Sequence, residues 1–185
     1  ESGLLLLKGG RLLDPALGLD DTADLLIEEW EIVRCARDLQ AEGAEVLELA
    51  GLTVVPGFVD LRARFGEPGR EDRETVESGL DAAAAGGYVA VCLTPENEPV
   101  CDTAGALEFL LARAGEHAVT LLPLGAVTQG LKGERLADLG ELARAGAAGF
   151  CEGNRGLPGV AALRGALSYS RMFGLPLFER AVERS

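Results

Sequence analysis

From residue 57 onward, continuous apolar runs alternate with amphipathic segments. The apolar runs predict five strands, at residues 57–61, 88–93, 119–127, 147–151 and 175–179. The segments between them predict four helices, at 73–85, 103–114, 133–145 and 159–173, and glycines follow these segments where a helix C-terminus favours them. Strands that alternate with helices are typical of a parallel α/β fold, and continuous apolar strands predict burial on both faces of the sheet.

This pattern is compatible with two architectures, an open doubly wound sheet or a (β/α)₈ barrel. A closed barrel needs eight strand–helix units and typically about 250 residues, whereas this chain of 185 residues supplies five strands. The sequence therefore predicts a partial barrel or an open sheet with an exposed edge. Such an edge would be covered by a longer natural chain or by pairing between chains.

Residues 1–56 have a different pattern, of short apolar runs separated by turn residues, which predicts a small β module without a long helix. Short strands are expected on either side of Gly9-Gly10 and of Glu28-Glu29, and the module ends at Pro56-Gly57. The predicted domains are thus 1–56 and 57–185. Trp30 lies inside the module, where it either packs or forms an exposed contact with a partner, and packing is favoured.

Composition narrows the possible partners and compartments. The formal net charge of −13 argues against binding to nucleic acids or anionic membranes, and no apolar run reaches the roughly 18 residues of a spanning helix. The start of the chain lacks the basic segment of a secretory signal. The four cysteines form no C-x-x-C pair, so we interpret them as small buried residues in a reducing cytoplasm.

Few residues suit metal or nucleophilic chemistry. His117 is the only histidine of the chain and is expected in a surface loop after a helix. Lys132 has no neighbouring base in its glycine-flanked segment, which indicates a solvated loop charge rather than a nucleophile.

The pair Arg62 and Arg64 ends the first apolar strand of the α/β region. Residues two apart on an extended strand share a face, so both side chains are predicted to point toward the carboxyl edge, where parallel α/β folds bind ligands. Two histidines in this arrangement would suit a metal. A guanidinium has five donors, no free lone pair and a permanent charge, so it repels a cation.

The chain resembles the dihydroorotase branch of the cyclic amidohydrolase superfamily along nearly its whole length. The matching stretches are KGGRLLDP, VVPGFVDL, EPG, ETVESGLDAAAAGGYVAVCLTPENEPVCDT, LPLGAVTQGLKGERLADLGELARAGAAGF and GLPLFE. The resemblance implies a (β/α)₈ barrel with a small β-sandwich built from the N-terminal segment and the far end of the chain. It also implies zinc-dependent, reversible cyclisation of carbamoyl aspartate to dihydroorotate in pyrimidine synthesis.

At the positions where the resemblance implies function, this sequence departs from the family pattern. The family's metal-binding histidines correspond to Arg62, Arg64 and Arg180, and the metal-binding aspartate falls in CEGN, where Glu152 is the only acid. The substrate-binding arginine corresponds to Gly66, and the substrate-binding asparagine to Glu96. Further ligands and the catalytic aspartate of the family would fall beyond Ser185.

These departures predict a protein that has lost the family zinc and is catalytically inactive. Because buried guanidiniums need counter-charges, we expect Arg62, Arg64 and Arg180 to converge in a network with Glu67, Glu96, Glu152 and Glu179. The resemblance implies a structural role as partner of aspartate transcarbamoylase, and self-association is possible. Two alternatives stay open: a zinc-dependent hydrolase with residual or altered activity on cyclic amides, and a metal-free module that binds a small anion at the arginines.

Overall fold

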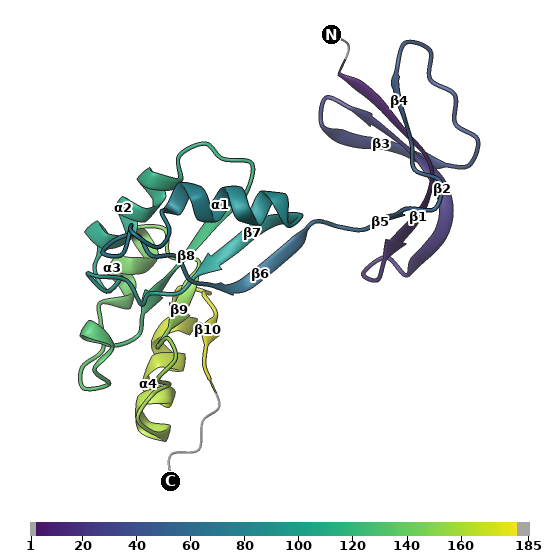
Figure 1. The fold of residues 1–185 in the computed structure, drawn as a ribbon. Helices are drawn as coiled ribbons and strands as arrows, with labels where there is room; N and C mark the ends of the chain where they lie inside the picture. Colours follow the sequence, from purple (N-terminus) through teal and green to yellow (C-terminus); the bar gives the residue numbers. More distant parts are fainter. Residues whose placement is uncertain (1–2, 181–185) are drawn as a thin grey trace. The chain divides into compact units, whose positions relative to one another are not determined.

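The computed structural model describes residues 3–180, in two compact units. The first unit is Glu1–Gly57 and the second is Phe58–Ser185 (Figure 1). All helices of the described part of the chain lie in the second unit.

The first unit forms a five-stranded sheet. Its strands are β1 (Leu4–Asp14), β2 (Leu19–Glu28), β3 (Glu31–Ala36), β4 (Glu45–Glu48) and β5 (Thr53–Val54). The order is β3-β2-β1-β4, with β5 also paired to β1. The predicted break at Gly9-Gly10 is wrong, because β1 continues through both glycines. A register shift between Leu7 and Gly10 accommodates them, with Gly9 at a φ of 71°.

A buried aspartate holds the centre of this unit together. Asp24 is 4% exposed and accepts hydrogen bonds from the backbone N–H groups of Gly9 (2.8 Å) and Leu39 (2.9 Å). These bonds satisfy the buried carboxylate and connect the bulge of β1 to the chain after β3. Leucines make up the buried apolar part of the unit: Leu6, Leu12, Leu25 and Leu39.

Trp30 does not pack, so the favoured interpretation of this residue is wrong. It lies with Glu29 in the two-residue turn between β2 and β3, and both have positive φ angles, of 48° for Glu29 and 70° for Trp30. Two successive positive φ values are typical of a tight hairpin turn that matches the twist of the strands. The turn places the indole at the tip of the hairpin, where it is 97% exposed.

The second unit is a curled, parallel five-stranded sheet with helices. Its strands are β6 (Phe58–Ala63), β7 (Tyr88–Leu93), β8 (Thr120–Ala126), β9 (Gly149–Cys151) and β10 (Leu177–Phe178), in the order β10-β9-β8-β7-β6. The helices are α1 (Val76–Ala85), α2 (Ala104–Ala114), α3 (Leu139–Arg144) and α4 (Val160–Arg171), and a short 3₁₀ turn, η1, spans Gln129–Leu131. This confirms the predicted α/β class.

Two details of the sequence prediction fail in this unit. The third helix begins at Leu139 rather than at 133, because Asp138 caps it by accepting from the Glu141 N–H, and the preceding residues form a loop. Strand β6 is not buried on both faces. It lies at the sheet edge, and Phe58, Val59 and Leu61 are 51–57% exposed.

The core of the second unit lies between the sheet and helices α1, α2 and α3. Fully buried side chains from strands and helices share it, including Leu80, Leu93, Leu107, Leu110, Leu142 and Phe150. The backbone of Gly125 lies close to the side chains of this core, because an added Cβ would lie 2.9 Å from a Leu142 methyl and 3.3 Å from the Phe150 ring. None of the helices within residues 3–180 has the length and apolar character required to cross a bilayer.

The four cysteines are free thiols in two environments. Cys92, Cys101 and Cys151 are buried as predicted, whereas Cys35 is exposed. Burial raises the pKa of Cys101 to about 12, with a smaller contribution from Asp102, and burial also raises the pKa of Cys92 and Cys151.

We expect a thiol-specific disulfide reagent to modify one cysteine per native chain rapidly and the other three only after denaturation. The reason is that the reactive species is the thiolate, which burial disfavours. The release of the coloured thiolate of the reagent measures this stoichiometry. The Cys35→Ser variant should lose the rapid phase, and fast modification of Cys101 in the native protein would contradict the buried arrangement.

Candidate functional site

The residues singled out by the sequence lie at the carboxyl ends of the parallel strands, but on different elements. Arg62 belongs to β6, which ends at Ala63, so Arg64 and Gly66 already lie in the following loop. Glu96 follows β7, Glu152 follows β9 and Arg180 follows β10. The sheet therefore places these residues along one of its edges, although the strands that they follow are far apart in the sequence.

Arg62 joins the end of β6 to the loop after β9. Its guanidinium donates to the backbone oxygen of Gly153 (2.9 Å) and to Oδ1 of Asn154 (2.8 Å). The backbone N–H of Asn154 donates to Oε1 of Glu96 at 3.1 Å, and its Nδ2 lies 3.2 and 3.3 Å from the two carboxylate oxygens. Asn154 thus connects Arg62 to Glu96, so the loops after β6, β7 and β9 are linked by side chains.

Glycine at position 153 is required for this connection. The residue has a φ of 65°, and an added Cβ would lie 2.6 Å from Cγ of Glu96. A side chain here would be strained by the backbone conformation and would also collide with Glu96.

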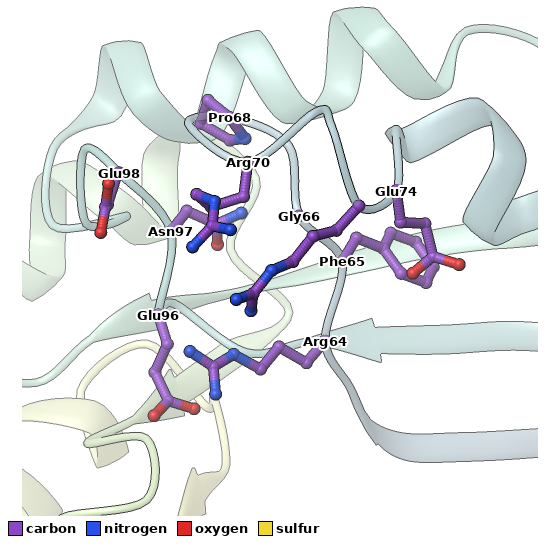
Figure 2. A pocket seen from close by; sticks show the side chains of 10 residues that line it. Arg64, Phe65, Gly66, Pro68, Arg70, Glu74, Glu96, Asn97 and Glu98 are labelled. Carbon is purple, nitrogen blue, oxygen red and sulfur yellow. The ribbon is translucent and has the colours of Figure 1, made fainter.

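Two separate cavities divide the predicted arginine cluster. Arg62 and Arg180 line a cavity of about 190 Å³, together with Glu179 and Cys151. Arg64, Gly66 and Glu96 line a different cavity of about 360 Å³ (Figure 2). The expectation that Arg62 and Arg64 share one site is therefore wrong. The physical reason is that β6 ends at Ala63 after a register shift against β7, so the alternation of an extended strand does not continue to Arg64.

The predicted network of arginines and glutamates is also not formed within residues 3–180. Arg62, Arg64 and Arg180 are exposed, so the need for buried counter-charges does not arise. Each glutamate has another partner: Glu67 pairs with Arg113 at 2.6 Å, Glu96 binds Asn154, Glu152 binds Thr128, and Glu179 accepts from the Leu157 N–H at 2.9 Å.

Glu152 is the most deeply buried carboxyl group at this edge, with 1% exposure. One of its oxygens accepts from the backbone N–H of Thr128 at 3.0 Å, and the other from the Thr128 hydroxyl in a short hydrogen bond. The Thr128 hydroxyl also accepts from the Gly133 N–H at 2.9 Å. Burial raises the pKa of Glu152; the bonds from Thr128 partly offset this effect, and nearby Glu179 adds to it.

This raised pKa predicts a pH dependence of stability. The folded protein holds the Glu152 proton more tightly than the unfolded chain does. The contribution of Glu152 to the free energy of unfolding is therefore fully present below the ordinary carboxyl pKa of 4.5, and it is lost as the pH rises through the pKa of the folded state. Glu152→Gln stays neutral and can still pair with Thr128. We expect its free energy of unfolding to fall less than that of the wild type between about pH 4.5 and pH 8.

Denaturant titrations followed by circular dichroism across this pH range measure the effect. Glu108→Gln, which removes a charge at an exposed position of α2, is the matched control and should keep the wild-type slope. Parallel pH profiles for the wild type and Glu152→Gln would contradict the assignment.

The residues present do not fit a zinc site. Within residues 3–180, no three His, Cys, Asp or Glu side chains come together in a group that could hold a metal ion. The positions where the resemblance implies imidazoles carry Arg62, Arg64 and Arg180, which cannot donate a lone pair. The only histidine, His117, lies after α2, with Nε2 3.2 Å from Asp81 and Nδ1 accepting from the Val119 N–H.

Sequence analysis missed three residues that organise this edge: Asn97, Thr128 and Asn154. Asn154 stands in CEGN directly after a predicted strand, and Thr128 and Asn97 also follow predicted strands. Their position at the carboxyl end of parallel strands was the available signal.

The fold of the chain is similar to that of several solved proteins. It superposes on the L-hydantoinase (dihydropyrimidinase) of Arthrobacter aurescens with a TM-score of 0.73 at 21% identity, covering 94% of this chain and 39% of that one. A solved dihydroorotase gives a TM-score of 0.63 at 13% identity, covering 95% of this chain and 50% of that one. At these identities the likeness establishes the fold alone: a curled, parallel half-barrel sheet with helices.

Sequence comparison then identifies the family. The Dihydro-orotase-like family model matches residues 51–163, so the chain belongs to this family. The dihydroorotase of Syntrophotalea carbinolica is 39% identical over 183 residues, covering 98% of this chain and 43% of the relative. That of Anaeromyxobacter dehalogenans is 40% identical over 178 residues, covering 95% and 41% respectively. The chain therefore spans about two-fifths of the length of these curated relatives.

Proposed function

We propose that the chain is a non-catalytic, dihydroorotase-like protein of pyrimidine biosynthesis that acts in the cytoplasm as a structural partner of aspartate transcarbamoylase. Membership of the family and the dihydroorotase relatives support the pathway. The four free thiols are in keeping with a reducing compartment.

One observation supports the proposal that the protein is inactive: guanidiniums occupy the carboxyl edge of the parallel sheet, where the family's metal is expected. Arg62 and Arg180 line the same small cavity, and Arg62 is fixed there by its bonds to Gly153 and Asn154. A permanently charged group within such a cavity repels a divalent cation. Loss of residues that merely support metal ligands already weakens metal binding by about 10–100-fold, so replacing the ligands themselves with cations should abolish it.

The decisive experiment combines metal analysis with turnover on the intact protein. The protein is equilibrated with zinc, dialysed and analysed for bound metal, and dihydroorotate hydrolysis is then measured with and without added zinc. We expect far less than one zinc per chain and no turnover above background, with the dihydroorotase of Syntrophotalea carbinolica as the active control. About one zinc per chain together with turnover would establish the alternative, a zinc-dependent hydrolase.

The partner is tested separately by sedimentation velocity. Mixtures with aspartate transcarbamoylase should contain a species larger than either protein alone. The fully exposed Trp30 at the hairpin tip is one surface available for such a contact, so Trp30→Ala is an informative variant. Independent sedimentation of the two proteins at micromolar concentration would refute the scaffold role and leave the zinc result unaffected.

A further inference from the structure

The hairpin that joins β2 to β3 presents large apolar side chains to solvent beside several acids. Its tip and the start of β3 have the sequence EEWEIV, residues 28–33, which we call the hairpin patch. Trp30 is 97% exposed, Ile32 is 64% exposed and Val33 is 50% exposed. The hairpin patch therefore offers more apolar surface than an isolated exposed side chain would.

Neither packing nor backbone preference explains a tryptophan at the hairpin tip. Trp30 occupies the second central position of the turn with a φ of 70°, where glycine or asparagine is favoured and a bulky side chain is unfavourable. The indole gains no burial in return, since it is almost fully exposed. Contact with another molecule would bury it and would account for its presence.

The turn holds Trp30 on a rigid backbone. Glu28 pairs with Glu31 across the hairpin, and Ile27 pairs with Ile32. The Glu29 N–H also donates to the Gly3 oxygen at 3.0 Å, which ties the tip to the chain just before β1. A preorganised contact of this kind loses less conformational entropy when a partner binds.

The edge of β3 is poorly suited to pairing with a strand of another chain. β3 is the edge strand of the order β3-β2-β1-β4, and its register against β2 shifts between Ile32 and Arg34. This shift leaves Val33 as an extra residue, and such a bulge twists an edge strand away from a neighbour. The side chains at the tip are therefore the better contact surface.

The charge of the hairpin patch indicates the kind of partner that it fits. Glu28, Glu29 and Glu31 are all exposed. The basic residues of the first unit are Lys8, Arg11, Arg34 and Arg37. Within residues 3–180, none of these basic groups lies within 4.0 Å of the three carboxylates, and Arg11 and Arg37 pair instead with Asp20 and Asp21.

Two kinds of occupant are disfavoured by this charge. An anionic lipid surface would be repelled by the carboxylates beside Trp30. A second copy of the chain would bring a formal net charge of −13 against another −13. A basic protein surface is the complementary one.

We propose that Trp30 inserts into an apolar slot of aspartate transcarbamoylase bordered by lysine or arginine side chains, with which Glu28, Glu29 and Glu31 pair. This contact rests on the proposed scaffold role and adds the surface that mediates it and the chemistry of the surface that receives it. A buried tryptophan often supplies much of the binding energy of an interface, and its ring attracts a lysine or arginine cation. The carboxylates speed the encounter with a basic surface.

Calorimetric titration of the intact protein with aspartate transcarbamoylase tests the role of the indole. Trp30→Gly should weaken binding by at least about 30-fold. Its midpoint of unfolding in urea, measured by pulse proteolysis, should equal or exceed that of the wild type, because glycine adopts a positive φ freely. Leu17→Ala is the control: Leu17 is 78% exposed in the turn between β1 and β2, and its removal should leave binding unchanged.

Stopped-flow association kinetics test the role of the carboxylates. The double variant Glu28→Gln and Glu31→Gln should associate several-fold more slowly and with a weaker dependence on salt, whereas its dissociation rate should change little. The double variant Glu42→Gln and Glu45→Gln removes two exposed acids outside the hairpin patch and should keep the wild-type rates.

A probe at the tip locates the contact directly. Trp30 is the only tryptophan of the chain, so 5-hydroxytryptophan incorporated there can be excited apart from the tryptophans of the partner. Acrylamide should quench its fluorescence several-fold less in the complex than in the free protein. Unchanged quenching would show that the indole stays in solvent and would overturn the contact.

The remaining outcomes separate this contact from the scaffold role. Binding that Trp30→Gly leaves intact would overturn the contact alone, whereas the absence of any complex would refute the scaffold role and the contact with it. Self-association of the chain, or binding to phosphatidylcholine vesicles, that is lost in Trp30→Gly would assign the hairpin patch to a second copy or to lipid instead. Far-ultraviolet circular dichroism verifies the fold of each variant.

Discussion

Gly66→Ala is expected to lower the free energy of unfolding of the second unit by about 3 kcal/mol. The new methyl group would lie 2.2 Å from the Arg70 oxygen and 2.8 Å from the Glu74 oxygen. Both are backbone atoms, so the turn before α1 would have to open. Guanidinium titration followed at 222 nm measures this loss, because all helices of the described chain lie in the second unit.

The matched control is Gly105→Ala in α2, where an added Cβ meets nothing within 4 Å. This substitution should stabilise the unit by up to about 1 kcal/mol, since alanine favours a helix over glycine. Equal stability of Gly66→Ala and the wild type would show that the loop is less constrained than the structure indicates. The same steric limit applies to arginine at position 66, so a single substitution cannot restore the substrate-binding side chain that the family resemblance implies there.

Phe150→Ala is expected to lower the free energy of unfolding of the second unit by about 4 kcal/mol. Phe150 lies in the middle of β9, is 0% exposed and is the largest of the fully buried side chains. Its ring packs near Gly125 and Leu142, so its removal leaves a cavity that surrounding backbone fills poorly.

Phe109→Ala on α2 is the control, since Phe109 is 40% exposed. It should cost less than about 1 kcal/mol. Tyrosine fluorescence gives an independent signal for this unit, because Tyr88 and Tyr169 both lie in it, whereas the only tryptophan lies in the first unit. Similar losses for the two phenylalanines would contradict the placement of Phe150 in the core.

The elements of the second unit were predictable where local signals agreed. Strand β7 spans Tyr88–Leu93 as predicted, because a continuous apolar run follows a glycine pair. The start of α3 was not predictable in this way. Residues 133–138 look helical by composition, but a bridge between Thr128 and Leu136 and the side-chain cap at Asp138 hold them in a loop. Such bonds depend on tertiary structure.

The sequence was sufficient to predict where the candidate site lies, but not which side chains contact one another there. The carboxyl edge of the sheet was identified from Arg62 and Arg64, yet the two side chains line different cavities. Their separation depends on where β6 ends and on its register against β7, which apolar patterning does not specify. The partners of the glutamates depend on the same long-range geometry. Glu67, for example, bonds to Arg113, which is 46 positions along the chain.

The strand order of the second unit has a consequence for how the chain acquires its structure. Each strand from β7 to β10 pairs with the strand that immediately precedes it in the sequence. The sheet can therefore grow by successive addition while the polypeptide is still leaving the ribosome, and no strand waits for a distant neighbour. Synthesis from the N-terminus onward supplies the strands in the order in which they pair.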